Sequence, residues 1–365
     1  MYWLFSFFPT AFLLNHFGAD PLVVFVACML AIIPMAQLME VSTTALARLI
    51  GPVLGGLLSA TMSNAPELII GISALRNGLT DILKYSIVGA IIGTLLFGLG
   101  LTIFCGNFKR RPTPFDAPMV AMNMGLLTVT SLGLTIPAIF NLSVQADHAI
   151  SFHICVLMLL LYLGSVYYTL NQDNPPIDKT GVAAALGQSN PSAPIERLDD
   201  GSEIHNHASW GFKKAISILI GVTIALALTS DLLTESIQPT AEMLHLTPFF
   251  AGMFLLSMVG NIPQFINSVS FARQNQMTLA LSVNLSSVTQ LSLLVAPLLV
   301  LSGPLFGQSM DLVFSNYSLF AIMVSVVVAR YLLADNRTTW LEGFMLIIMY
   351  LMMAVGFFYL PALHT

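Results

Sequence analysis

The sequence predicts an all-α polytopic membrane protein, and three observations point to this fold class: sparse charge, long apolar runs and an uneven distribution of basic residues. Of the 365 residues, 56% are apolar and only 8% are charged, whereas soluble domains carry about 25% charged residues. Charges this sparse cannot cover the surfaces of the roughly two or three soluble domains that such a length forms. The composition therefore excludes a soluble globular enzyme and a disordered chain. The net charge of −5 also excludes a nucleic-acid binder that relies on a basic surface.

Eleven apolar runs are long enough to cross a bilayer, which takes about 20 residues. They lie near residues 2–17, 22–47, 53–75, 80–105, 116–140, 149–170, 213–233, 247–272, 277–301, 312–333 and 339–361. The first run is short and has no basic segment before it, so we interpret it as a retained span and not as a cleaved signal peptide.

The basic residues predict the orientation of these spans. Arg76 and Lys84 are expected on one side of the membrane, and the other eleven of the 13 Lys and Arg residues on the opposite side. This asymmetry places the N-terminus and the long loop in the cytoplasm and the C-terminus outside. No organellar targeting segment is visible, so we expect a prokaryotic inner membrane.

The segment 172–212 is the one clearly polar stretch of the sequence. It contains several prolines, an acidic patch between Glu196 and Glu203, and then His205 and His207. We interpret it as a solvated cytoplasmic linker between two halves of the protein. A metal-sensing role for the acidic and histidine residues is the alternative.

An internal repeat relates the two halves at an offset of 197 residues. Residues 64–76 read NAPELIIGISALR, and residues 261–273 read NIPQFINSVSFAR. Five predicted spans separate the start of one copy from the start of the next. Because five is odd, the second copy enters the membrane inverted, as in many secondary transporters. The predicted organisation is an N-terminal helix (1–20), a first five-helix repeat (21–171), the linker (172–212) and a second five-helix repeat (213–365).

The repeated motif contains residues that can build a site within the membrane. Pro66 and Pro263 each remove a backbone N–H and disrupt a helix, and the carbonyl groups released in this way need partners, such as a bound cation. Asn64 and Asn261 can cap the restarted helices or offer side-chain oxygens. Simple proline kinks that improve helix packing are the structural alternative.

Glu67 is predicted to lie near the middle of its span. An ionised carboxylate at that depth is costly unless a cation or a proton neutralises it. Competition of the two for one carboxylate is the basis of cation/proton antiport. The alternative is a structural glutamate that stays protonated.

Other acidic residues lie closer to the ends of the spans. Asp231 and Glu235 are candidates for an outer vestibule that attracts cations. Glu40 and Glu342 are interpreted as interfacial charges whose side chains extend to the membrane surface.

These residues together resemble the Ca²⁺/H⁺ antiporters of the cation/Ca²⁺ exchanger superfamily, over nearly the whole chain. Residues 32–78 and 230–261 resemble the two signature regions of that family. The resemblance implies ten core helices in two inverted repeats, one extra N-terminal helix and a cation site between the paired motifs. The residues carried over as cation- or proton-binding are Ser63, Asn64, Glu67, Thr94, Gly260, Asn261, Ser287 and Gln290, with Glu67, Asn64 and Asn261 as the metal ligands. Ser63 replaces a glycine of the first motif, and Thr94 replaces an asparagine.

The sequence departs from the family pattern where negative charge is expected. Gln264 stands in place of the second-motif glutamate, Phe265 in place of a histidine, and Thr44 and Ala45 in place of paired acids. Gln238 also stands near the position of an expected acid. Ca²⁺ takes 6–8 oxygen ligands and favours several carboxylates, whereas one carboxylate matches the charge of a monovalent ion. We still include Gln264 among the candidate site residues, because its amide oxygen can bind a cation.

The leading functional hypothesis is Ca²⁺/H⁺ exchange by alternating access around Glu67. The charge count leaves open weakened Ca²⁺ handling or a Na⁺ or K⁺/H⁺ exchanger of the same fold, and the missing acids leave open a membrane homologue that no longer transports. No H-E-x-x-H, G-x-S-x-G or P-loop signature occurs, so the sequence favours a secondary transporter over an enzyme. The expected partners are inorganic cations and the lipid bilayer, with no cofactor and no nucleic acid.

Overall fold

The computed structural model describes residues 2–144, 147–170 and 210–360. These residues are almost entirely helical. One short two-stranded sheet, β1 (Thr113–Pro114) and β2 (Arg337–Thr338), pairs antiparallel and joins two loops at one end of the molecule. The linker with its acidic and histidine residues lies outside the described residues.

The helices before the linker include two interruptions within apolar runs, one between α3 and α4 and one where a π-helical turn separates α5 from α6. Their bounds are η1 (Tyr2–Ser6), α1 (Phe7–His16), α2 (Pro21–Ile50), α3 (Pro52–Met62), α4 (Ala65–Arg76), α5 (Thr80–Ile92), the π segment η2 (Gly93–Gly98), α6 (Leu99–Asn107), α7 (Ala117–Val144) and α8 (Asp147–Leu170).

The helices after the linker contain two further π segments. Their bounds are α10 (Phe212–Met243), α11 (Pro248–Phe250), the π segment η3 (Ala251–Leu256), α12 (Ser257–Arg273), α13 (Met277–Gln290), the π segment η4 (Leu291–Val295), α14 (Ala296–Ser302), η5 (Gly303–Phe306), α15 (Asn316–Leu332) and α16 (Trp340–Phe358).

Local sequence explains where several of these helices begin. Asp20 accepts a hydrogen bond from the backbone N–H of Leu22 (3.2 Å) and precedes Pro21, so it caps α2. Gly51 adopts φ +93°, which L-residues rarely tolerate, and this turn allows α3 to start directly after α2. Thr339 and Glu342 form a reciprocal capping box at the start of α16. Glu342 is thus a helix-capping residue.

Eight helical stretches in the described part of the chain are long and apolar enough to cross a membrane. Three predicted spans fall outside this set. The run 2–17 forms only the short α1 and η1, the run 53–75 is divided into α3 and α4, and α15 has 17 residues. The prediction of a nearly all-helical membrane protein is confirmed at this level.

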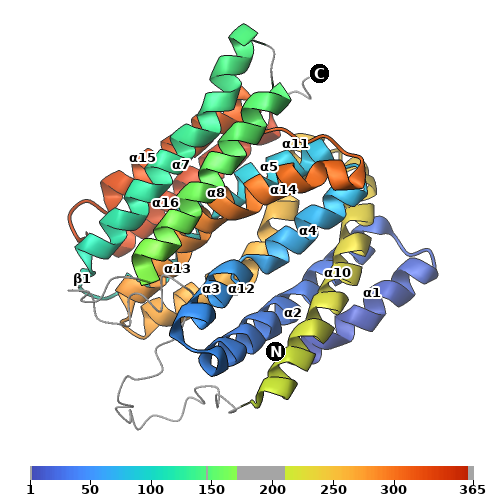
Figure 1. The fold of residues 1–365 in the computed structure, drawn as a ribbon, viewed down its shortest axis with the longest axis horizontal. Helices are drawn as coiled ribbons and strands as arrows, with labels where there is room; N and C mark the ends of the chain where they lie inside the picture. The colour runs from blue at the N-terminus through green and yellow to red at the C-terminus, as the bar shows by residue number, and fades with distance from the viewer. Residues whose placement is uncertain (1, 145–146, 171–209, 361–365) are drawn as a thin grey trace.

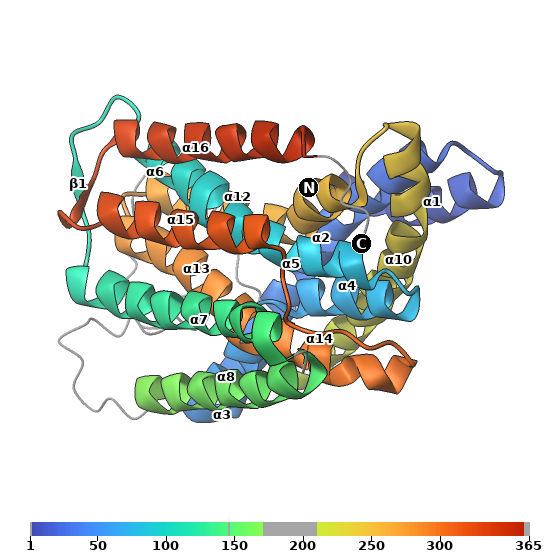
Figure 2. The ribbon, with the colours of Figure 1, turned by 90° about the horizontal axis from the view of Figure 1, so that it is seen from above.

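The helices form two flanking groups around a central one (Figures 1 and 2). α1, α2 and α10 lie on one flank, and α7, α8, α15 and α16 lie on the other. Between them lie α4, α5, α12, α13 and α14, which carry both copies of the repeated motif. Helices from the two halves are therefore interleaved at the centre.

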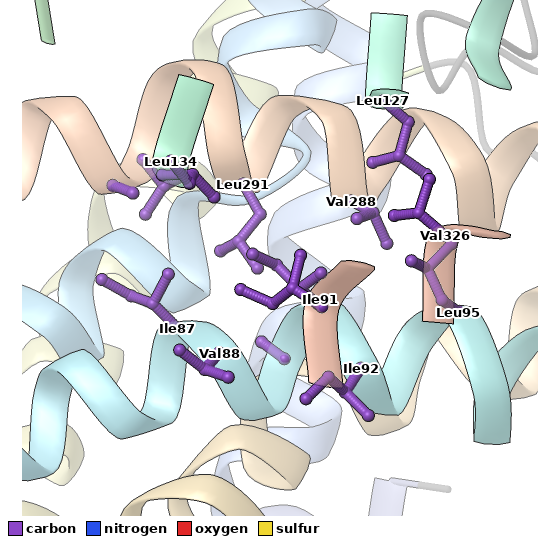
Figure 3. Packing of buried hydrophobic residues seen from close by; sticks show 14 of the residues in the cluster. Ile87, Val88, Ile91, Ile92, Leu95, Leu127, Leu134, Val288, Leu291 and Val326 are labelled. Carbon is purple, nitrogen blue, oxygen red and sulfur yellow. The ribbon is translucent and has the colours of Figure 1, made fainter. Parts of the chain in front are cut away.

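The packing core surrounds α5 and η2. Figure 3 shows Ile87, Val88, Ile91, Ile92 and Leu95 packed against Leu127 and Leu134 of α7, Val288 and Leu291 of α13 and η4, and Val326 of α15. A Cβ at Gly89 would collide with the carbonyl of Met253, and a Cβ at Gly252 would collide with the carbonyl of Ile82. Glycine at these positions allows α5 and η3 to approach closely, which brings the first half against the second motif.

Candidate cation-binding site

The first motif lies at an interruption between two helices. α3 ends at Met62, Asn64 has non-helical backbone angles (φ −111°, ψ 24°), and α4 begins at Ala65 with Pro66 next. Pro66 suits the first turn of a helix, where its missing N–H would be unpaired in any case. Glu67 follows in that first turn, where the partial positive charge of the helix N-terminus favours a carboxylate.

The second motif differs, because α12 continues through Asn261 and Pro263. The expectation that both prolines break their helices, and that Asn261 caps a restarted one, is therefore wrong for this copy. Asn261 Nδ2 donates to the carbonyl oxygen of Ser257 (2.7 Å), and the hydroxyl of Ser257 donates to the carbonyl of Met253. The irregularity lies upstream instead, in the π segment η3, and these side chains satisfy carbonyl groups along that stretch.

A hydrogen-bond network joins the interrupted first motif to α13. Asn64 Nδ2 donates to Gln290 Oε1 (3.0 Å), and the hydroxyl of Ser63 donates to the same oxygen. The hydroxyl of Ser287 lies 2.8 Å from Asn64 Oδ1. Four of the predicted site residues are thus brought together across more than 200 positions of sequence.

Gln264 belongs to the same network, on its α13 side. Its Oε1 lies 2.7 Å from the hydroxyl of Ser287, and its Nε2 donates to the carbonyl of Val283 (3.3 Å). Ser287 has a single hydroxyl proton, so it can donate to Gln264 or to Asn64 but not to both at once. The amide at position 264 is therefore held toward its own half of the protein.

Thr94 provides the reciprocal link from the first half to the second motif. Its hydroxyl donates to Asn261 Oδ1 (3.3 Å), and both side chains are buried. Thr94 lies in η2, immediately beyond the end of α5. Thr94 thus links the first half of the chain to the second motif.

Glu67 faces a narrow cavity with a volume of about 20 Å³, which is room for roughly one water molecule. Ser86, Ser257 and Gly260 line it together with aliphatic side chains. The Oε2 atom of Glu67 is buried and has no hydrogen-bond partner among the described residues. A Cβ at Gly260 would lie 3.0 Å from Oε1 and Cγ of Glu67, so glycine there leaves space for the carboxylate.

The surroundings of Glu67 leave one of its carboxylate oxygens without a partner among the described residues. No hydrogen bond among the described residues joins Glu67 to Gln264, so the carboxylate is not held against that amide, as a packed structural acid would be. The cavity is small and its walls are mainly aliphatic. An orphan carboxylate oxygen in such a place lacks the bonds that buried polar groups normally have.

The two vestibule candidates, Asp231 and Glu235, have different surroundings. Asp231 accepts hydrogen bonds from Ser73 and from Arg76 Nη1 (3.1 Å), so a cationic partner offsets its charge. Glu235 is exposed and lines a second cavity of about 400 Å³ near the ends of α4 and α10, together with Glu242. Only Glu235 therefore presents its charge to open space.

Some residues of the site were missed at the sequence level. Ser86 and Ser257 line the cavity of Glu67, and the signal for Ser257 was its place four residues before Asn261, on the same helix face. Glu40, expected as an interfacial charge, accepts a hydrogen bond at Oε2 from Asn267 Nδ2 on α12 (2.7 Å). Within the described residues no group of three or more His, Cys, Asp or Glu side chains gathers as a metal cluster would.

Comparison with known proteins identifies the family to which this chain belongs. The sequence profile described as "Sodium/calcium exchanger protein" matches residues 21–171 and 214–359. The chain is 31% identical to a Ca²⁺/H⁺ antiporter of Aphanothece halophytica, over 98% of this chain and 96% of that protein. It is 32% identical to the Ca²⁺/H⁺ antiporter ChaA of Bacillus subtilis, over 93% and 92% of the two chains. The crystal structure of the Ca²⁺/H⁺ antiporter protein YfkE superposes with a TM-score of 0.78 at 28% identity and covers 98% of both chains.

Proposed function

This chain belongs to the sodium/calcium exchanger protein family, and from that premise we propose that it exchanges Ca²⁺ for H⁺ across a membrane. It is a membrane protein and a secondary transporter, not an enzyme, as its curated relatives are. The observation that carries the substrate pair is the buried Oε2 of Glu67, which has no protein partner in the described chain. A cation and a proton compete for that oxygen, and each is released when the other binds.

The oxygen atoms around Glu67 suit a hard cation such as Ca²⁺. The hydroxyl of Ser257 and the backbone beside Gly260 share its cavity, and the amide oxygens of Asn64 and Asn261 lie on the two motifs. We propose that Glu67, Asn64 and Asn261 bind the ion directly. Ser63, Thr94, Gln264, Ser287 and Gln290 then hold the two asparagines in position through the hydrogen bonds described above.

We propose eleven spans, arranged as the N-terminal helix followed by two inverted five-helix repeats. The π segments support the repeat, because 93–98 shifted by the offset of 197 gives 290–295, and η4 covers 291–295. The interrupted pair α3 and α4 counts as one span in this scheme. With the basic residues on the cytoplasmic side, the N-terminus and the linker lie inside a prokaryotic inner membrane and the C-terminus lies outside.

Alternating access then connects Glu67 to one side at a time. On the outer side, the cavity lined by Glu235 and Glu242 serves as the vestibule. Its negative charge concentrates cations near the ends of α4 and α10. The Arg76–Asp231 pair holds those two helices together at the same end.

The proposal is tested with purified protein in liposomes that contain a pH-sensitive dye. Ca²⁺, Na⁺ and K⁺ are added in turn, and proton flux is recorded for the wild type and for Glu67→Gln. We expect flux with Ca²⁺ that is lost in Glu67→Gln, because an amide cannot exchange a proton for a cation. If only Na⁺ or K⁺ drives proton flux, the assignment of Ca²⁺ as the substrate is wrong. If no ion drives flux, the proposal that the protein is a transporter is wrong.

A further inference from the structure

Glu40 is a carboxylate that the site around Glu67 does not use. It lies ten residues before the end of α2 at Ile50, about 15 Å along the helix axis. Its side chain is exposed. Ionisable side chains within membrane-crossing helices generally face water between helices and not lipid.

The hydrogen-bond partner of Glu40 shows which helix lies next to it. Asn267 on α12 donates from Nδ2 to Glu40 Oε2 at 2.7 Å. Asn267 lies one turn beyond Gln264 and seven residues beyond Gly260, which lies beside Glu67. Seven helical residues correspond to about 10 Å along the axis. The residue bonded to Glu40 therefore lies, along α12, between Gly260 and the end of the helix at Arg273.

Polar residues continue along the same face of α2. Gln37, Glu40, Thr44 and Arg48 follow one another at intervals of three or four, which places them on one side of the helix. None of these four side chains is buried. Ser63, at the interruption of the first motif, is also exposed. The polar face thus leads from the ends of α2 and α12 toward the site.

We propose that Glu40 and Asn267 form a second cation site, at which Ca²⁺ is held between the cytoplasmic end of these helices and Glu67. Rotation of the Asn267 side-chain amide by half a turn places Oδ1 where Nδ2 now lies. A carboxylate oxygen of Glu40 and an amide oxygen of Asn267 then face the ion together. Glu40 also supplies a negative charge to this part of the protein, where Gln264 is neutral. This inference rests on the proposed function, since it assigns a role in the same transport.

The test uses everted membrane vesicles, in which the proposed cytoplasmic side faces the added Ca²⁺. Removing a unit charge about 10 Å from a divalent ion weakens its binding on the order of tenfold at intermediate effective dielectric. We therefore expect Glu40→Gln to raise the half-saturating Ca²⁺ concentration by that factor, while Glu40→Asp retains most of the affinity. Asn267→Asp adds a charge at the site and lowers the concentration. The same variants measured from the opposite side change little.

Asp335→Asn is the matched control. It removes one acidic charge from the loop before α16, at the same end of the molecule, and its Oδ1 can still accept from the N–H of Arg337. We expect this variant to have the half-saturating Ca²⁺ concentration of the wild type. Equal half-saturation for Glu40→Gln and wild type overturns the proposal, and so does an equal change from both sides, which a purely structural contact predicts. Wild-type vesicles without exchange contradict the proposed function instead.

A second measurement serves if Glu40→Gln does not reach the membrane. Glu40→Cys is placed in a chain whose Cys28, Cys105 and Cys155 are replaced by alanine, and a membrane-impermeant thiol reagent is added to everted vesicles. We expect labelling that Ca²⁺ slows. A thiol that stays unreactive, or that reacts at the same rate with and without Ca²⁺, contradicts the proposal.

Discussion

The two copies of the repeated motif share sequence but differ in structure and in charge. At 63–67 the helix is interrupted, and the carboxylate of Glu67 begins a new helix with one oxygen unpartnered. At 260–264 the helix is continuous, and the amide of Gln264 is bonded to Ser287 and Val283. In the mechanism we propose, chemistry and positioning are divided between the halves. The first motif carries the titratable group, and the second shapes the space around it through Gly260 and Asn261.

The largest expected effect comes from moving the carboxylate between the motifs. The double variant Glu67→Gln/Gln264→Glu keeps the charge count but places the charge where the side chain is bonded toward α13. Leaving a buried ion without its partner costs about 3–5 kcal/mol, so we expect Ca²⁺-driven proton flux to fall a hundredfold or more. Flux near the wild-type level in the double variant would mean that the two motifs are interchangeable.

A smaller effect is expected from filling the space beside Glu67. Gly260→Ala places a Cβ 3.0 Å from the carboxylate oxygen and displaces that flexible side chain. A rotamer shift of that size costs about 1 kcal/mol, so the half-saturating Ca²⁺ concentration should rise about fivefold. Gly164→Ala on α8 is the control, because a Cβ there has no neighbour within 4 Å. Equal affinities for the two variants would contradict the role given to Gly260.

The paired asparagines are expected to differ in their contribution to stability. Asn64→Ala removes bonds to Gln290 and Ser287 and leaves buried groups unpaired, at about 1–3 kcal/mol. Asn261→Ala removes a longer bond from Thr94 (3.3 Å) and a bond to the carbonyl of Ser257 within α12, so its cost is smaller, about 1 kcal/mol. Thermal unfolding in detergent should therefore show a lower midpoint for Asn64→Ala. The reverse order would show that the interrupted helix depends less on this network than the continuous one.

The smallest effect is expected at the outer vestibule. Glu235→Gln removes an exposed charge whose influence on cations is screened by salt. We expect the rate of Ca²⁺ uptake from the outer side to fall about twofold at low ionic strength and to match the wild type at high salt. Asp231→Asn would instead weaken the ion pair with Arg76 and lower stability slightly, most at low salt.

The sequence was informative wherever one residue type implies one kind of environment. Sparse charge and long apolar runs predicted a helical membrane protein. The repeat drew attention to Asn64 and Asn261, and the family resemblance to Gln290 and Thr94, with which they form hydrogen bonds. The family resemblance is confirmed by the comparisons.

Features that depend on packing between distant helices were not predicted. Nothing local in Leu291–Val295 distinguishes a π turn from an α-helix, because the extra residue is stabilised by neighbouring helices. Pro263 carries the same local signal as Pro66, yet only the first accompanies an interruption. Ser86 became visible as a residue of the Glu67 cavity only once the helices that face it were in place.

The measurement that most directly tests the account is the number of protons exchanged per Ca²⁺. Calcium and proton fluxes are recorded together in liposomes whose membrane potential is held with valinomycin and K⁺. With Glu67 as the single titratable ligand at the central site, we predict one proton per Ca²⁺, with net charge movement that responds to the applied potential, and Gln264→Glu should shift the ratio toward two. A wild-type ratio of two, with exchange that is insensitive to potential, would contradict the account.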